Sequence, residues 1–167
     1  MSATLREVIG ETQHKFRLDA DSARVCFRTR SELTQGLRVD TNIRQHALVM
    51  DEPQAIGGGD SGPAPVEVLL AALAACQEIT YKAYAAAMGI ALERVVVELE
   101  GDIDLRGFFG VDDSVRPGLS AIRGRVELTS SAPRAALDTL KAAVDSHCPV
   151  LDMLRNPVPV SLTLASP

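Results

Sequence analysis

The segment that most constrains the fold is an unbroken apolar run, Val68–Cys76, which follows two closely spaced prolines. Nine consecutive apolar residues cover every face of a helix, whereas a surface helix keeps polar residues on one side. Pro65 suits the first turn of a helix, where a missing N–H costs little, and Gly89 is a natural stop. We therefore predict a central helix from about Pro65 to Gly89 that is buried nearly all round.

Composition argues against membranes and nucleic acid as partners. The apolar run is shorter than the roughly 18 residues of a membrane span, and Glu67 and Glu78 flank it closely. The formal net charge of -5 does not favour binding to nucleic acid, which is itself negatively charged. The sequence has no run of Lys or Arg that would bind a membrane surface. The first residues lack the apolar stretch of a secretory signal. We therefore expect a cytoplasmic protein that binds neither nucleic acid nor membrane.

The remaining patterns predict an α+β layout. Residues 1–22 show no clear period and are interpreted as a lead-in, while 23–167 are expected to form a single domain. Ser130 or Ser131 is expected to cap the second long helix. Alternating residues predict strands, and apolar spacing predicts two further helices. The strands are expected at Ala23–Arg30, Leu37–Thr41, Arg44–Met50, Ala91–Asp104, Leu119–Thr129 and Val158–Leu164, and the helices at about Pro133–Cys148 and Val150–Arg155.

Two loops carry distinctive residues. The glycine-rich loop Ile56–Gly62 could present N–H groups to an anion at the helix start. It lacks both the G-x-G-x-x-G pattern and the Lys–Ser/Thr ending of a phosphate loop, so we do not expect phosphate there. The loop Arg106–Gly118 holds Phe108 and Phe109. That pair is interpreted either as a flap over a pocket or partner surface, or as part of a buried loop.

Three cysteines are too few, and odd in number, for a disulfide framework, so redox chemistry is the more reasonable role for any pair. Cys76 ends the apolar run, where a thiol often serves only as a small hydrophobe. Cys148 follows Val144 by four residues and so shares its inward face. Pro149 suits the first position of a following helix, which makes Cys148 its N-cap, where a thiolate is stabilised. Cys26 falls on the charged side of its expected strand.

These motifs carry a family resemblance. The segment Asp51–Cys76, with its glycines and its Pro-Ala-Pro, followed far downstream by Cys148-Pro149-Val150, resembles the OsmC/Ohr family. The match covers most of the chain, from about Ala23 to Leu164. It implies the OsmC-like fold, with antiparallel sheets around a long buried central helix in an intertwined homodimer.

The resemblance also implies a function. Members reduce organic hydroperoxides at the expense of thiols, in oxidative stress defence. Cys76 would be the peroxidatic cysteine and Cys148 would resolve it as a disulfide, which an external dithiol must reduce. This chemistry requires no metal, flavin or other cofactor.

In the family, an arginine from the early strands, held by a glutamate of the helix, stabilises the thiolate. Arg38 is the candidate here, with Arg44 next, although each is also interpretable as a solvated strand residue. The usual glutamate position, ten before the first cysteine, is Val66, and Glu67 lies one step nearer. On a regular helix nine residues turn about 180° net, which points Glu67 away from Cys76. Glu67 is then expected to favour the helix dipole, unless the helix start is distorted.

Other functions remain open at this point. One is a non-catalytic or redox-sensing OsmC-like module, with a structural cysteine pair and a small apolar ligand bound beneath the two phenylalanines. A metal site is disfavoured because His14, His46 and His147 show no ligand spacing. A cysteine hydrolase with His147 as base is equally disfavoured, because neighbours on a helix point about 100° apart.

Overall fold

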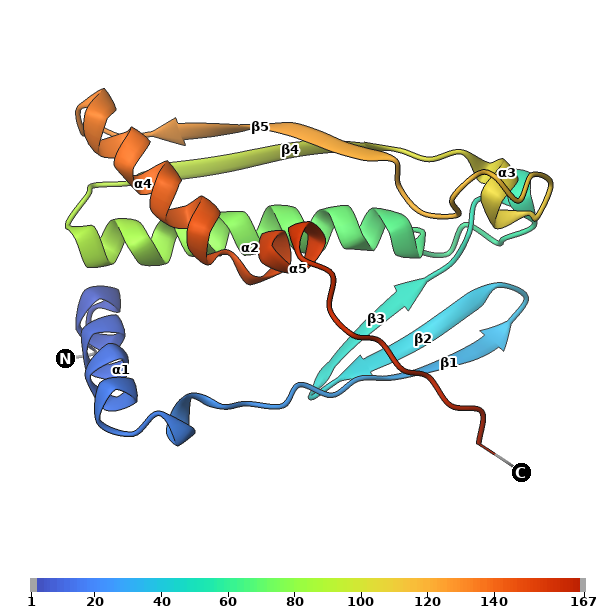
Figure 1. Cartoon of the computed structure of the whole chain (residues 1–167), viewed down its shortest axis with the longest axis horizontal. Coiled ribbons are helices and arrows are strands. Elements are labelled where there is room, and N and C mark those ends of the chain that lie inside the picture. The colour runs from blue at the N-terminus through green and yellow to red at the C-terminus, as the bar shows by residue number, and fades with distance from the viewer. Residues whose placement is uncertain (1–2, 166–167) are drawn as a thin grey trace. The chain divides into compact units, whose positions relative to one another are not determined.

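The computed structural model describes residues 3–165 (Figure 1). The chain divides into two compact units, the first comprising the residues up to Ala72 with Leu99–Gly124, the second Leu73–Glu98 with the residues from Arg125 onward. The elements in chain order are α1 (Leu5–Leu18), η1 (Asp21–Ala23), β1 (Arg30–Gln35), β2 (Arg38–Ile43), β3 (His46–Met50), η2 (Gln54–Ile56), α2 (Pro65–Met88), β4 (Arg94–Asp102), α3 (Leu105–Phe108), β5 (Ala121–Thr129), α4 (Arg134–His147) and α5 (Pro149–Arg155).

Most of the expected lead-in forms a helix, α1, and η1 follows it. Thr4 starts this helix with a capping box, because its side chain accepts from the Glu7 N–H while the Glu7 carboxylate accepts from the Thr4 N–H at 2.7 Å. The spacing of Thr4 and Glu7 therefore predicts a helix start, although the residues that follow show no clear apolar period. None of the residues of α1 is buried, so capping and local pairs hold it rather than a core.

β1, β2 and β3 form a three-stranded antiparallel sheet in that order. The second and third predicted strands are confirmed, but Arg44 lies in the turn between them with a φ of 56°. The prediction of a strand from Ala23 is wrong, because the first residue paired in the sheet is Arg30. Before it, Val25 and Phe27 are 72% and 89% exposed. Alternation alone did not make that segment a strand, since a strand needs a neighbour to pair with.

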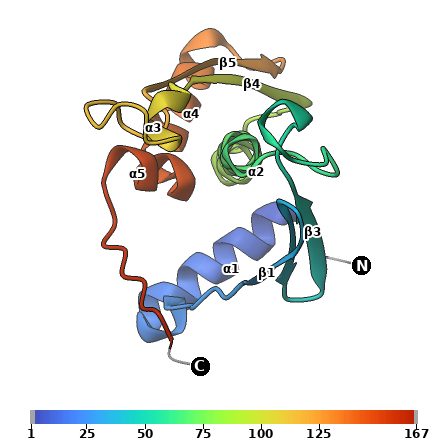
Figure 2. The same cartoon turned by 90° about the vertical axis from the view of Figure 1, so that its right-hand side faces the viewer.

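β4 and β5 form a two-stranded sheet and run side by side in both views (Figures 1 and 2). Its ends are fixed by bonds from Glu93 N–H to the Thr129 carbonyl and from Ser120 N–H to the Asp102 carbonyl, so the pairing is antiparallel. Both strands were predicted, a few residues longer than observed. The expected loop after them contains the short helix α3.

The predicted central helix is confirmed in its bounds, since α2 runs from Pro65 to Met88. Gly89 follows with a φ of 71°, and the Ile90 N–H donates to the Ala85 carbonyl, which ends the helix. Near-complete burial is not met within the chain, because Ile79 is 69% exposed. The buried residues of α2 lie on one side of it, and they are Leu73, Gln77, Thr80, Tyr81 and Ala85.

The core of the second unit lies between α2, α4 and the sheet. Tyr81 and Ala85 of α2 pack with Leu140 and Val144 of α4, all at most 1% exposed, and with Leu92. Partly buried residues of β4 and β5 complete this cluster. Within residues 3–165, none of the helices combines the length and apolar character that a membrane crossing requires.

Two predictions near the C-terminus are wrong in detail. The N-cap position of α4 is Pro133, which makes no side-chain cap bond, and not Ser130 or Ser131. The Ser130 hydroxyl donates to the Ala91 carbonyl instead. The expected closing strand is not formed over the described part of 158–164, where Leu162 is 92% exposed. As with the segment before β1, it has no paired neighbour among residues 3–165.

Candidate functional site

The structure brings together the two cysteines singled out by the sequence. Cys76 of α2 and Cys148, between α4 and α5, both belong to the second unit, and their sulfur atoms are 3.3 Å apart. Both are free thiols, Cys76 partly buried and Cys148 1% exposed. A disulfide bond has a length of about 2.05 Å, so a small movement suffices to form one.

Cys148 is held at this position by the break between two helices. Its N–H donates to the Val144 carbonyl at 2.9 Å, which closes α4, and its carbonyl accepts from the Asp152 N–H at 3.0 Å, which opens α5. Pro149 takes the first position of α5, where its missing N–H has no cost. The prediction that Cys148 is the N-cap of a short helix is thus confirmed.

Two polar residues of α2 beside Cys76 were not found from the sequence. The Thr80 hydroxyl, one turn later, donates to the Cys76 carbonyl at 2.7 Å, and Thr80 is 8% exposed. Gln77 is 6% exposed, and its Nε2 has no hydrogen-bond partner among the described residues. Both sit within an apolar helix, where periodicity alone marks them as ordinary core positions. Their polarity inside that stripe was the available signal.

The environment of Cys76 opposes ionisation. Burial is the largest effect and raises the pKa of the Cys76 thiol. The neighbouring Cys148 sulfur also raises this pKa, through a hydrogen bond and charge, whereas the Val150 N–H and the Thr80 hydroxyl lower it. The net result is a raised pKa. Because the thiolate is the nucleophile, this thiol needs further stabilisation before it becomes reactive.

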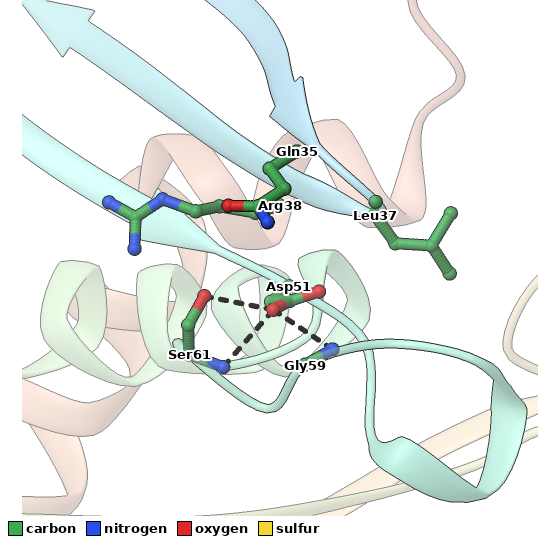
Figure 3. A pocket seen from close by; sticks show the side chains of 7 residues that line it. Gln35, Leu37, Arg38, Asp51, Gly59 and Ser61 are labelled. Atoms are coloured by element: carbon green, nitrogen blue, oxygen red, sulfur yellow. Dashed lines mark hydrogen bonds between the residues drawn. The ribbon is translucent and has the colours of Figure 1, made fainter.

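Arg38, the predicted source of that stabilisation, lies in the first unit at the start of β2. Its Nη2 pairs with Asp40 Oδ1 at 2.7 Å, and hydrogen bonding and charge from Asp40 raise the pKa of the guanidinium. The arginine therefore has a carboxylate partner on its own strand. Arg38 also faces a cavity of about 380 Å³ (Figure 3), lined in addition by Gln35, Gly36, Leu37, Asp51, Gly59 and Ser61.

Glu67 serves the start of α2 in this structure. Its carboxylate accepts from the Ala64 N–H at 2.8 Å, within the first turn. α2 is a continuous α-helix from Pro65 to Met88, so the nine residues between Glu67 and Cys76 turn about 180° net. The contact observed is the helix-dipole role that the sequence left open for Glu67.

Asp51 organises the glycine-rich loop, a role that the sequence analysis missed. The residue is 3% exposed, and its carboxylate accepts from the N–H groups of Gly59 and Ser61 and from the Ser61 hydroxyl, at 2.8 to 3.2 Å (Figure 3). It also accepts from the Glu52 N–H at 2.8 Å. The anion that the loop amides bind is thus a side chain of the chain itself. Burial raises the pKa of Asp51, but these bonds together outweigh it and the pKa lies below its usual value.

The remaining candidates from the sequence are the two phenylalanines, the third cysteine and a metal site. Phe108 and Phe109 stack edge to face and are 61% and 54% exposed, and they do not line the cavity beside Arg38. Cys26 is exposed and free. Among the described residues, no group of three or more His, Cys, Asp or Glu side chains is arranged to hold a metal ion.

A family model described as "OsmC-like protein" matches residues 57–163. The chain belongs to the OsmC-like family. The match includes both clustered cysteines, and it contains α2 together with everything from β4 to α5. No curated protein matches the chain.

Solved structures support the OsmC-like fold. An OsmC-like protein from Mycoplasma pneumoniae is 20% identical with a TM-score of 0.68, over 80% of this chain and 89% of that one. An organic hydroperoxide resistance protein OsmC from Legionella pneumophila is 19% identical with a TM-score of 0.60, over 79% and 90%. A putative organic hydroperoxide resistance protein from Vibrio cholerae, with captopril in one of its active sites, is 18% identical with a TM-score of 0.58, over 80% and 88%.

The Asp51 cluster predicts a pH-dependent stability. Its folded-state pKa is depressed, so its contribution is present above the unfolded pKa of about 3.9 and is lost as pH falls through the lower folded value. Asp51→Asn should lower the melting temperature at pH 7, and this difference should shrink below about pH 4. Thermal unfolding followed by circular dichroism measures both. The exposed Asp113→Asn is the matched control, and a deficit for Asp51→Asn equal at both pH values would contradict the assignment.

Proposed function

We propose that this protein reduces organic hydroperoxides with the Cys76–Cys148 pair, Cys76 as the peroxidatic and Cys148 as the resolving cysteine. The observation that carries the proposal is the 3.3 Å separation of their sulfur atoms. Membership of the OsmC-like family supports it, as does the likeness in fold to proteins described as organic hydroperoxide resistance proteins.

The reaction balances with the two cysteines, the hydroperoxide and an external dithiol. The Cys76 thiolate attacks the outer peroxide oxygen, the O–O bond breaks, and the leaving alkoxide takes a proton and departs as an alcohol. Cys76 is then a sulfenic acid, which condenses with the Cys148 thiol to a disulfide and water. Exchange with an external dithiol returns both thiols and carries the two electrons. A cytoplasmic setting, where dithiol reductants keep thiols reduced, fits this cycle.

Cys76 is assigned the attacking role because it is the more accessible of the two thiols, Cys148 being 1% exposed. The raised pKa of Cys76 means that the attack depends on a stabilised thiolate. Arg38 is proposed to supply the positive charge, since its side chain is 37% exposed and lines a cavity. Glu67 is proposed to act mainly at the helix start.

We also propose that the protein works as an intertwined homodimer. One side of α2 and the segments before β1 and after α5 present apolar side chains to solvent, including Phe27 at 89%, Ile79 at 69% and Leu162 at 92% exposure. The two segments are unpaired and alternate in the manner of strands, as strand addition requires. A second copy of the chain would cover these surfaces.

A second candidate function is a non-catalytic or redox-sensing OsmC-like module that binds a small apolar ligand. It is favoured by the partial burial of Cys76 against the Cys148 sulfur, which raises the pKa of the Cys76 thiol and leaves it less reactive. The experiments on Cys76 and Arg38 below separate the two functions.

The cysteine pair predicts both turnover and a specific disulfide. Cys76→Ser should abolish consumption of an alkyl hydroperoxide in the presence of a dithiol, because no sulfenic acid can form. In the wild type, mild peroxide should link Cys76 to Cys148 and leave Cys26 free, as peptide mapping by mass spectrometry reports. Cys26→Ser is the control and should keep full activity. A Cys26 disulfide, or undiminished turnover in Cys76→Ser, would contradict the proposal.

The proposed charge predicts an effect on thiol reactivity. Arg38→Ala should raise the pKa of Cys76 and reduce its peroxide reactivity by about tenfold or more, because each pKa unit corresponds to about 1.4 kcal/mol. The rate of thiol alkylation against pH measures this, with Arg44→Ala and Glu67→Gln compared. Glu67→Gln should have little effect. If only Arg44→Ala shifts the pKa of Cys76, Arg44 and not Arg38 is the stabilising arginine. If none of the variants shifts it, the binding module is favoured.

The dimer predicts the solution mass. Light scattering at micromolar concentration should give twice the mass of the chain, since an interface that covers these surfaces buries more than about 2,000 Å². Ile79→Lys, on the exposed side of α2, should weaken association, whereas Arg134→Ala on α4, whose side chain is 87% exposed, should not. A monomer in the wild type would end this proposal.

A further inference from the structure

Thr80 occupies a special place relative to Cys76. It follows Cys76 by four residues on α2, about one turn, so both side chains lie on neighbouring parts of the same helix face. Its hydroxyl donates to the Cys76 carbonyl at 2.7 Å, and the residue is 8% exposed. The one polar atom of this buried side chain therefore already contacts the residue that carries the nucleophile.

The bond that Thr80 makes here is redundant for the helix. In a regular α-helix the Cys76 carbonyl also accepts from the backbone N–H of Thr80, four residues on. The hydroxyl can therefore turn away without leaving that carbonyl unpaired. A threonine hydroxyl hydrogen rotates to suit its acceptor. The Cys76 sulfur is the acceptor that changes most during the proposed reaction, because ionisation converts it into a full negative charge.

We propose that the Thr80 hydroxyl turns from the Cys76 carbonyl to the Cys76 sulfur when the thiol ionises, and that it is a hydrogen-bond donor to the reactive thiolate. The inference rests on the proposed function, in which the Cys76 thiolate attacks the hydroperoxide. In this step the Cys76 S–H bond breaks, its proton passes to solvent, and the electron pair stays on sulfur. Thr80 itself exchanges one acceptor for another and remains neutral.

The groups around Cys76 leave room for this role. From the α4–α5 junction, the titratable group that acts on Cys76 is Cys148, and its sulfur opposes a charge on Cys76. Opposing that effect are two neutral donors, the Val150 N–H and the Thr80 hydroxyl, which favour the thiolate. The Val150 donor is backbone and is held in α5, so the Thr80 hydroxyl is the side-chain donor that a substitution can remove.

A second threonine of the chain makes the same local bond without a cysteine beside it. Thr139 on α4 makes the same bond to a carbonyl four residues earlier, at 2.9 Å, on an exposed part of its helix. Bonds of this kind are common in helices and have little effect on stability. Thr139 thus provides a matched control, with the same residue type and the same local bond, on the helix that leads to Cys148.

The test compares Thr80→Val, Thr80→Ser and Thr139→Val in the full-length protein, with no peroxide present. Iodoacetamide is the probe, and mass spectrometry of the Cys76 peptide gives its alkylation rate against pH. Thr80→Val should move the midpoint of the curve upward by about one pH unit, the size of one hydrogen bond to a charged acceptor. Thr80→Ser keeps the hydroxyl and should retain the wild-type midpoint, as should Thr139→Val.

A folded Thr80→Val with the wild-type midpoint would overturn the inference, as would an equal shift in Thr139→Val. If Thr80→Val does not fold by circular dichroism, Thr80→Ala takes its place with the same expectation. Because the assay contains no hydroperoxide, its result is independent of turnover. An unshifted midpoint in Thr80→Val refutes the role of Thr80. A wild-type protein that consumes no hydroperoxide refutes the proposed function.

Discussion

The packing of α4 against α2 is the interaction on which the site depends. Leu140 and Val144 are fully buried against Tyr81, and Cys148 follows Val144 by the same four-residue step. The apolar face of α4 therefore ends at the Cys148 sulfur. The core contacts that hold this face against α2 also determine which part of α2 the sulfur lies beside. Tyr81 lies five residues beyond Cys76, so the layer of packed side chains is immediately next to the pair. The 3.3 Å contact between the sulfurs is a consequence of that layer.

The same packing creates the chemical difficulty of the site. Bringing two sulfur atoms together in a core removes water from both, and burial is the largest cause of the raised pKa of Cys76. A second thiol close by adds to the opposition as soon as it carries charge. Disulfide formation requires the two sulfur atoms to be close together in the core, whereas ionisation of Cys76 is opposed by that same burial. Polar groups inside the apolar stripe, Thr80 and Gln77, are the features that a merely structural core would not need.

The sequence predicted those parts of the fold whose causes are local. Pro65 and Gly89 mark the ends of α2, and Pro149 both ends α4 and begins α5, because these residues act through their own backbone. Cys148 was placed at the helix junction for that reason. α1 is the exception, since its capping box was present at Thr4 and went unused.

Other features depend on neighbours that the sequence does not name. The segments before β1 and after α5 alternate as strands do, yet pairing decides whether a strand forms, and this chain offers them no partner over the described residues. The part of Asp51 as the anion of the glycine loop required knowing that β3 ends beside Gly59 and Ser61. For Thr80, the decisive fact is a sulfur atom one turn away, and a helical pattern gives it no more weight than any buried threonine.

The carboxylates explain why neutral donors matter in this chain. An arginine is most effective at stabilising a thiolate when its charge is not already balanced, but Arg38 is paired with Asp40 at 2.7 Å. Glu67, which could compete for that arginine, is held by the Ala64 N–H at the start of α2. An ion pair presents a weaker field than a single cation, because its two charges nearly cancel at a distance. If Arg38 stabilises the Cys76 thiolate as proposed, hydrogen bonds made directly to sulfur are needed beside it, because they act at contact distance and are not cancelled by Asp40.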